Sequence, residues 1–319
     1  MRFNRITSVV ILLLILLATF SAGCGNRTNT ASSGGKLKVM TSVYPVYEFT
    51  RQVGGDKVDV TLLVPAGAEP HDWEPTAKEI LLIRSAKLFL YHGAGFENID
   101  KLLTNDALGT TQAIAVSKGI APLLPDLNNA AAEPGQKDDQ AKEHEHSDSH
   151  MWLDPVNAQQ EVANIAAALA AVDPQNRDYY QKNAANYNSD LAQLDQEYQK
   201  GLAAVTRRDI ITSHAAFGYL ARRYQLHQVA IMGLTPDSEP TPERMAQVVK
   251  FCREYTVKYI FFETLISPKL AETISKETGA KLLVLNPVES LTEEELRQGK
   301  NYLSIMRENL HNLQKALNE

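Results

Sequence analysis

One long helical segment constrains the fold of this chain more than any other feature. Residues 175–205 form a run of about thirty residues interrupted only by Gly201. Apolar or aromatic side chains recur there at three- and four-residue steps, at Tyr180, Ala184, Tyr187, Leu191, Leu194 and Tyr198. This spacing predicts one helix of about 45 Å, with Asp173 and Pro174 at its start. A helix that long is the size of a whole domain, so we expect it to join two parts of the chain.

Strand-like and helix-like segments alternate on both sides of this helix. We expect strands at 37–43, 58–64, 87–91, 113–116, 209–212, 228–232, 258–262 and 281–285. We expect helices at 46–53, 77–86, 96–103, 156–172, 215–224, 242–255, 268–278 and 293–317. Such alternation predicts parallel sheets covered by helices. The predicted fold is therefore α/β, with two lobes (37–172 and 206–319), each a mainly parallel sheet flanked by helices, joined by one long rigid helix (173–205).

The N-terminus is expected to lie outside this fold. Arg2 and Arg5 precede an almost wholly apolar stretch over residues 6–20, and small residues follow. This pattern predicts a secretory signal peptide over residues 1–23, with an uncleaved anchor as the alternative. Residues 24–36 are rich in Gly, Ser, Thr and Asn, and this composition predicts a flexible tether.

The two cysteines have different predicted roles. Cys24 follows Ala22 and Gly23, a context that resembles a bacterial lipoprotein signal, in which the cysteine is lipidated. A lipid and a tether would hold a folded domain at the outer face of the cell membrane without a membrane-spanning segment. Cys252 stands in the middle of a predicted helix, and we interpret it as a small buried residue. We expect no disulfide in the mature chain.

Residues 125–149 contain almost no large apolar side chain and are predicted to be a mobile, acidic, histidine-rich loop. Three of the eight histidines lie within seven residues here, at 144, 146 and 150. The whole chain has 32 basic and 38 acidic residues and a net charge of -6. Nucleic-acid-binding proteins are usually basic, so this balance argues against that class.

Three histidines stand where predicted strands end or where the loop closes. His71 follows the second strand, His214 follows the strand at 209–212, and His150 ends the loop. Ligands of open α/β sheets bind outside the carboxyl ends of the strands. Three imidazoles and one oxygen ligand there would form a tetrahedral zinc site. The alternative is that each is an exposed or hydrogen-bonded loop histidine.

An enzyme is not predicted. The run from His144 through His146 and Asp148 to His150 is similar to the ligand motif of metallo-β-lactamases, but it has one residue too many. It also lies in a low-complexity loop, whereas a catalytic metal needs ligands on a rigid frame. The chain has no His-Glu-x-x-His, Gly-x-Ser-x-Gly, Walker or Gly-x-Gly-x-x-Gly motif.

Several segments together resemble the zinc/manganese solute-binding proteins of ABC importers. They are 69–76 (EPHDWEPT), the histidine-rich loop, 150–155 (HMWLDP), 213–219 (SHAAFGY) and 261–263 (FFE). The similarity runs from about residue 37 to the C-terminus. It implies two α/β lobes, a rigid connecting helix and a metal in the cleft between the lobes. It also implies a permease partner in the membrane; we expect a monomer.

The resemblance also implies a ligand set. His71, His150 and His214 match the three histidine ligands of the family. Asn286 occupies the place where many members carry an aspartate ligand, and it is a poor neutral substitute. Glu289 resembles the glutamate ligand of the subgroup with an Asn-Pro-x-Glu segment. We predict Glu289 as the fourth ligand, with water or Glu263 as the alternative.

The third histidine bears on which metal is bound. Manganese-binding relatives carry a glutamate at the position of His214, and imidazole suits zinc whereas carboxylate suits manganese. The resemblance therefore implies a protein that captures Zn²⁺ outside the cytoplasm and delivers it to an importer. A manganese-binding protein or an adhesin of the same family is the alternative, and a zinc hydrolase is less favoured.

Residues near the predicted ligands are assigned supporting roles. Trp73 and Trp152 each follow a ligand histidine by two residues and could wall the site or belong to the core. Asp72 or Glu74 could orient an imidazole. His144 and His146 could gather zinc as accessory ligands, or the loop that carries them could be dispensable.

Overall fold

The structure is a computed structural model, and it describes residues 35–124, 147–236 and 239–319. Within them the first lobe contains a four-stranded parallel sheet of order β2-β1-β3-β4. Its strands are β1 (Leu37–Thr41), β2 (Val58–Leu62), β3 (Leu88–Tyr91) and β4 (Gln112–Ala115). The helices among them are α2 (Tyr44–Gly54), α3 (Ala77–Ser85) and the short α4 (Asn105–Leu108). Leu88, Phe89 and Leu90 are fully buried, as in a strand covered on both faces.

A second four-stranded parallel sheet repeats this plan, with the order β6-β5-β7-β8. Its strands are β5 (Asp209–Thr212), β6 (His227–Ala230), β7 (Tyr259–Phe262) and β8 (Lys281–Val284). Its helices are α7 (Gly218–Tyr224), α8 (Pro242–Glu254), α9 (Lys269–Thr278) and α10 (Glu293–Arg297). The prediction of two α/β lobes with parallel sheets is confirmed.

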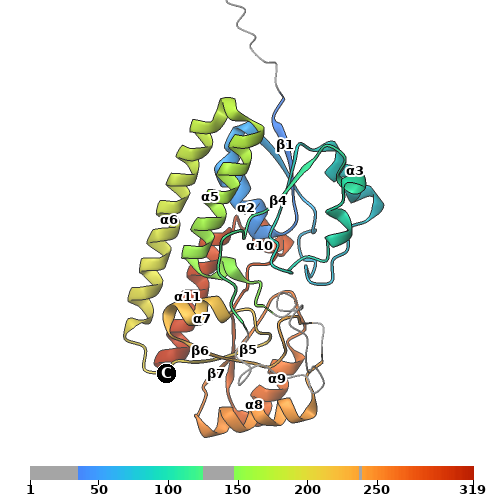
Figure 1. Cartoon of the computed structure of the whole chain (residues 1–319). Coiled ribbons are helices and arrows are strands. Elements are labelled where there is room, and N and C mark those ends of the chain that lie inside the picture. The colour runs from blue at the N-terminus through green and yellow to red at the C-terminus, as the bar shows by residue number, and fades with distance from the viewer. Residues whose placement is uncertain (1–34, 125–146, 237–238) are drawn as a thin grey trace, which may run out of the picture. The chain divides into compact units, whose positions relative to one another are not determined.

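The long helix α6 (Arg177–Ala203) packs along α5 (Pro155–Val172), and the two lie side by side in Figure 1. Its 27 residues span about 40 Å. The predicted apolar stripe is buried, from Tyr180 to Tyr198. The helix starts later than expected, because a 3-10 turn occupies Pro174–Asn176. The Asp173 carboxylate accepts hydrogen bonds from Asn176 and Tyr180 and fixes this turn.

Two other predicted helices differ in the structure. The expected helix at 96–103 is only a 3-10 turn over Asp100–Leu102. The expected closing helix at 293–317 is broken into α10 and α11 (Tyr302–Asn318). The break lies at Gly299, whose φ of 73° is incompatible with a continuing helix, and Asn301 caps the new helix.

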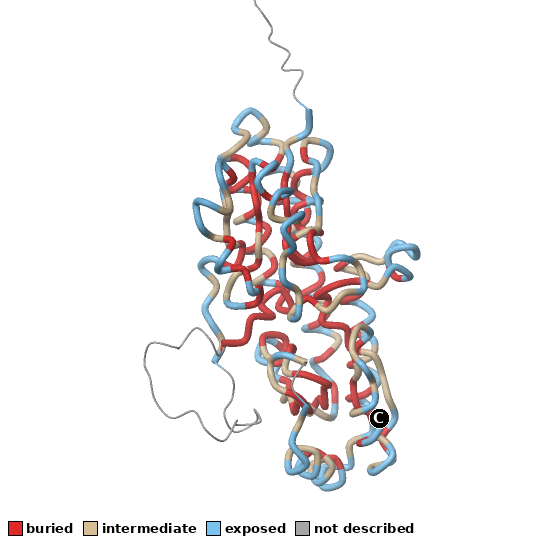
Figure 2. Tube along the Cα trace, turned by 90° about the vertical axis from the view of Figure 1, so that its right-hand side faces the viewer, coloured by how far each residue is buried: buried red, intermediate tan, exposed pale blue. Residues whose placement is uncertain are grey.

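The main hydrophobic core continues through both lobes. It contains buried residues of α2, α5, α6, α7 and α11 together with strands of both sheets. Figure 2 shows buried segments running through the body of the chain. The start of α11 packs against the first lobe, where the rings of Tyr302 and Phe49 lie 4.9 Å apart. Lys36–Glu319 accordingly form one unit.

Two further expectations concern Cys252 and the loop at 125–149, of which residues 125–146 lie outside the described residues. Cys252 is 2% exposed and lies in a second, smaller cluster under α8 and α9, as predicted. Residues 147–149 belong to the segment expected to be mobile, but they are buried. Asp148 forms an antiparallel bridge with Leu123 there, which anchors the backbone. In the part of the chain that the structure describes, no helix is both long and apolar enough to cross a bilayer.

Candidate metal centre

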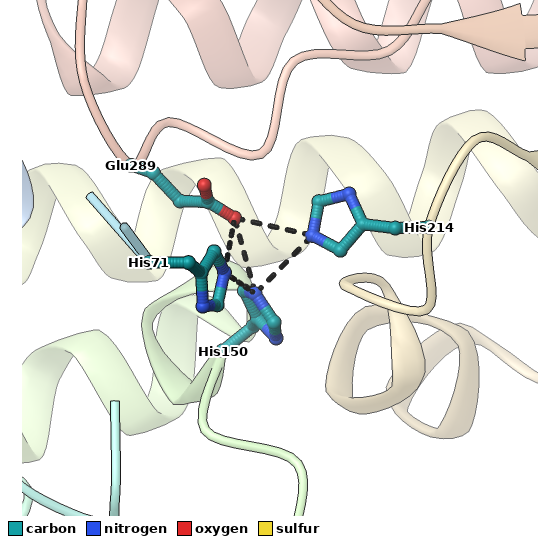
Figure 3. Close-up of side chains that lie close together, drawn as sticks. All are labelled: His71, His150, His214 and Glu289. Atoms are coloured by element: carbon teal, nitrogen blue, oxygen red, sulfur yellow. Dashed lines mark hydrogen bonds and ion pairs between the residues drawn. The ribbon is translucent and has the colours of Figure 1, made fainter. Parts of the chain in front are cut away.

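Loops that follow three strands, together with the segment before α5, bring the four predicted ligands together. His71 lies between β2 and α3, His214 between β5 and α7, and Glu289 between β8 and α10. His150 immediately precedes the 3-10 turn Met151–Leu153 that leads into α5. The donor atoms of all four residues lie within 4.8 Å of one another. Figure 3 shows the three imidazoles pointing toward the Glu289 carboxylate.

The spacing of these atoms matches a small tetrahedral ion. Oε1 of Glu289 lies 3.0, 3.3 and 3.6 Å from the Nε2 atoms of His150, His214 and His71. The Nε2 atom of His150 lies 3.4 Å from those of the other two histidines. Ligands about 2.0–2.1 Å from a tetrahedral ion are separated by about 3.3 Å from one another. Oε1 of Glu289 has no well-formed hydrogen bond among the described residues, so its geometry suits a coordination cage better than a hydrogen-bonded pair.

The four side chains of the centre are buried, and burial and neighbouring charges shift the pKa values of Glu289, His150 and His214. The side chains of His150, His214 and Glu289 are at most 1% exposed, and that of His71 is 5% exposed. Burial alone would raise the pKa of Glu289, but the three facing imidazoles hold it well below its usual range. Burial opposes protonation of His150 and His214, yet nearby carboxylates outweigh it. The pKa of His150 is raised, and that of His214 is raised well above its ordinary value. Without metal, the centre is an ionised carboxylate that attracts protons to its imidazoles.

Two carboxylates hold the far sides of two imidazoles. Asp148 Oδ1 lies 2.9 Å from Nδ1 of His150 and also accepts the backbone N–H of that residue. Glu263 Oε1 lies 2.7 Å from Nδ1 of His214. A proton on each Nδ1 leaves the Nε2 lone pair free for a metal. Glu263 therefore lies on the wrong side of the ring to be the fourth ligand.

Sequence reasoning missed the orienting role of Asp148. The one sequence feature that could have indicated this role is the position of Asp148, an acidic residue two positions before the candidate ligand His150. Asp72 or Glu74 was considered as a residue that could orient an imidazole, but neither is hydrogen-bonded to one among the described residues. Asp72 is exposed, and Glu74 accepts a hydrogen bond from Asn98.

His71 is held differently from the other two histidines. Its backbone N–H donates to Glu69 at 3.2 Å, and its ring packs against Phe96 with centroids 4.6 Å apart. Burial and the nearby Glu289 carboxylate raise the pKa of Glu69 to about 7. Among the described residues, no carboxylate is hydrogen-bonded to Nδ1 of His71, the nitrogen that faces away from Glu289. This imidazole is fixed by packing and by its loop.

The remaining predicted site residues fall into three groups. Asn286 is buried and turned away from the ligands, because its side chain bonds to Val288 N, Thr264 and Glu295. Trp152 is fully buried in the core, whereas Trp73 is half-buried at its edge. His144, His146 and Cys24 lie outside the described residues.

A buried ionisable pair behind the site was also missed. Nδ1 of His92 lies 3.7 Å from Oε1 of Glu161, and both side chains are fully buried. None of their four ring-nitrogen and carboxylate-oxygen atoms has a hydrogen-bond partner among the described residues. Burial lowers the pKa of His92 to about 3. Burial and the Glu97 carboxylate raise the pKa of Glu161 well above its usual range. Burial therefore favours the neutral form of both side chains.

Comparison with known proteins gives a consistent result. A family model described as "Zinc-uptake complex component A periplasmic" matches residues 39–316. The high-affinity zinc uptake system protein ZnuA of Bacillus subtilis is 42% identical over 322 residues, which cover 96% of this chain and 97% of that protein. The zinc-binding lipoprotein AdcA of Streptococcus pneumoniae is 41% identical over 314 residues, covering 98% of this chain. The match spans only 61% of that longer relative.

A solved structure supports the fold assignment. The Zn(II)-bound ZnuA-like domain of Streptococcus pneumoniae AdcA superposes with a TM-score of 0.75 at 41% identity. The alignment covers 89% of this chain and all of that domain.

Proposed function

This chain belongs to the family of the periplasmic zinc-uptake component A, ZnuA, and from that premise we propose that it captures Zn²⁺ outside the cytoplasm and delivers it to an ABC importer. The proposed ligands are His71, His150, His214 and Glu289. The observation that carries this proposal is their spacing, since three imidazole nitrogens and one carboxylate oxygen surround a volume that fits a tetrahedral ion.

The donor set favours zinc over manganese. Imidazole is a preferred ligand of zinc, whereas manganese favours carboxylates, carbonyls and water. The site has one carboxylate toward the centre, because Glu263 and Asp148 are engaged on the far sides of the rings. The descriptions of the Bacillus and pneumococcal relatives as zinc proteins support the same choice.

The proposed role is binding without catalysis. Catalytic zinc sites use three protein ligands and leave the fourth position to water or substrate. Here four side chains would fill a tetrahedral shell. The family, a zinc-uptake component, supports the same assignment.

The proposed location is the outer face of the cytoplasmic membrane. There the chain would be anchored by lipid on Cys24 and would meet a membrane permease of the importer. The segment Ala22-Gly23-Cys24 supports this anchor, as does the description of the pneumococcal relative as a lipoprotein.

A competition titration of the mature chain with a chromophoric zinc chelator tests the proposal. We expect one tight zinc site and much weaker binding of manganese. His214→Ala should weaken zinc binding by more than about a hundredfold, because loss of an outer-shell partner alone costs 10–100-fold. His311→Ala, an exposed histidine on α11, is the matched control. Unchanged affinity in His214→Ala would overturn the assigned site.

A further inference from the structure

The loop that carries Glu289 comes from the second lobe but is hydrogen-bonded to the first lobe. Three donors of the first lobe reach three carbonyls of this loop: Trp152 Nε1 to Pro287 (2.8 Å), Tyr44 N to Glu289 (3.3 Å) and Gly67 N to Leu291 (3.0 Å). Two of these donors are backbone amides, which any residue could supply. Of these three donors, Trp152 alone uses its side chain. Its hydrogen bond is therefore the one of the three that a substitution can remove directly.

The loop needs such a contact because its backbone is strained. Val288 has a φ of 60°, a left-handed conformation that is costly for a β-branched residue. The Asn286 side chain stabilises one side of this turn by accepting the backbone N–H of Val288 at 2.8 Å. The indole N–H of Trp152 donates to the carbonyl of Pro287, the residue between Asn286 and Val288. The strained residue directly precedes Glu289, so the position of the carboxylate depends on this turn.

Trp152 is itself firmly placed and close to another ligand. It is fully buried, and its backbone carbonyl accepts a hydrogen bond from the hydroxyl of Tyr302. Its ring centroid lies 5.5 Å from that of His150, two residues earlier in the chain. One side chain therefore links the segment of the His150 ligand to the loop of the Glu289 ligand.

We propose that Trp152 is a positioning residue that sets Glu289 against the three histidines. This role rests on the proposed zinc site. A zinc–carboxylate bond is about 2.0–2.2 Å long, and a displacement of roughly 0.5 Å already spoils such a site. A relaxed turn at Pro287 would move the carboxylate by moving its backbone, while the histidines stay in place.

The test compares the two tryptophans of the chain. Trp152→Phe keeps an aromatic ring and removes the N–H donor. Trp73→Phe is the matched control, because Trp73 also follows a ligand histidine by two residues and has no hydrogen bond to the Glu289 loop among the described residues. We expect Trp152→Phe to weaken zinc binding roughly tenfold, the lower end of outer-shell effects. Trp73→Phe should change it less than about twofold.

A double-mutant cycle separates positioning from general damage to the fold. In a Glu289→Gln background, Trp152→Phe should add little further loss, because the group that it positions has already been weakened. An equal loss in both backgrounds, or full affinity in Trp152→Phe, overturns the positioning role. Failure of the wild-type chain to bind zinc overturns the proposed function instead.

Hydrogen exchange of the wild-type chain keeps the proposal testable if Trp152→Phe does not fold. The Trp152 indole N–H should be protected from exchange both with and without zinc. Exchange at the rate of an exposed indole would overturn the proposal.

Discussion

The Nδ1 atom of His214 lies 2.7 Å from Oε1 of Glu263, on the side of the ring away from the other ligands. Glu263 also accepts the backbone N–H of His214 at 3.2 Å. One buried carboxylate thus fixes both the backbone and the ring of this histidine. Glu263 follows β7, and His214 follows the neighbouring strand β5, so the sheet sets the distance between them.

We predict that Glu263→Ala weakens zinc binding by about 10–100-fold and leaves one zinc site. The imidazole would lose the partner that fixes its tautomer and orientation. Glu263→Gln retains an oxygen acceptor for Nδ1–H and should lose less affinity than the alanine variant. Chelator competition measures both. Equal losses in the two variants would show that the hydrogen bond does not orient His214.

Zinc binding should release protons near neutral pH. The pKa values of His150 and His214 are raised, so the metal-free centre holds protons up to a higher pH than an ordinary histidine would. Zinc must displace them, so affinity should rise with pH until the raised pKa is passed, by about tenfold per pH unit for each proton displaced. Calorimetric titrations at pH 7 in buffers of different ionisation enthalpy measure the protons released. A binding enthalpy independent of the buffer would contradict this prediction.

Asn286→Asp should destabilise the chain without supplying a ligand. The Asn286 amide donates to Glu295 Oε1 at 3.2 Å, so a carboxylate at this position would face another buried carboxylate. We expect a loss of about 1–3 kcal/mol in the free energy of unfolding, measured by urea denaturation. Combined with Glu289→Ala, the substitution should not restore zinc binding, because residue 286 is turned away from the centre. Restored affinity would show that the loop can rearrange to present it.

Glu161→Gln should alter how stability depends on pH. The pKa of Glu161 is raised well above about 4.5 in the folded state, so the folded chain keeps a proton that the unfolded chain loses. The wild type should therefore lose about 1.4 kcal/mol per pH unit relative to the variant as pH rises above about 4.5, until the folded pKa is passed. Urea unfolding at pH 5 and pH 7 measures the difference. Glu254→Gln, exposed on α8, is the control. Parallel pH curves for wild type and Glu161→Gln would contradict the prediction.

The periodicity of the sequence was sufficient for the α/β plan but not for its interruptions. Short apolar segments alternating with amphipathic ones predict parallel sheets because each element must bury one face. The break before α11 was missed because apolar residues recur at helical spacing on both of its sides, although Gly299 and the capping residue Asn301 mark it. The 3-10 turn before α6 depends on hydrogen bonds from Asn176 and Tyr180 to Asp173, which periodicity does not encode.

The candidate ligands could be selected from strand ends and from family resemblance, whereas their supporting residues could not. Asp148 belongs to a stretch without large apolar residues, so local reasoning predicts that it is exposed. Its burial depends on distant partners, namely a bridge to Leu123 and close packing on Gly218. A Cβ atom on Gly218 would lie 2.4 Å from the Asp148 carboxylate. Contacts of this kind are tertiary and leave no local pattern.

The return of α11 to the first lobe has a consequence for the order of synthesis. Tyr302 packs on Phe49, and its hydroxyl bonds to the carbonyl of Trp152, so the packing of the first lobe is completed by residues that are made after the strands of the second lobe. Until residues 302–318 emerge, part of the apolar surface of α2 and α6 has no cover. The first lobe therefore cannot reach its final packing before the second lobe and α11 have been translated.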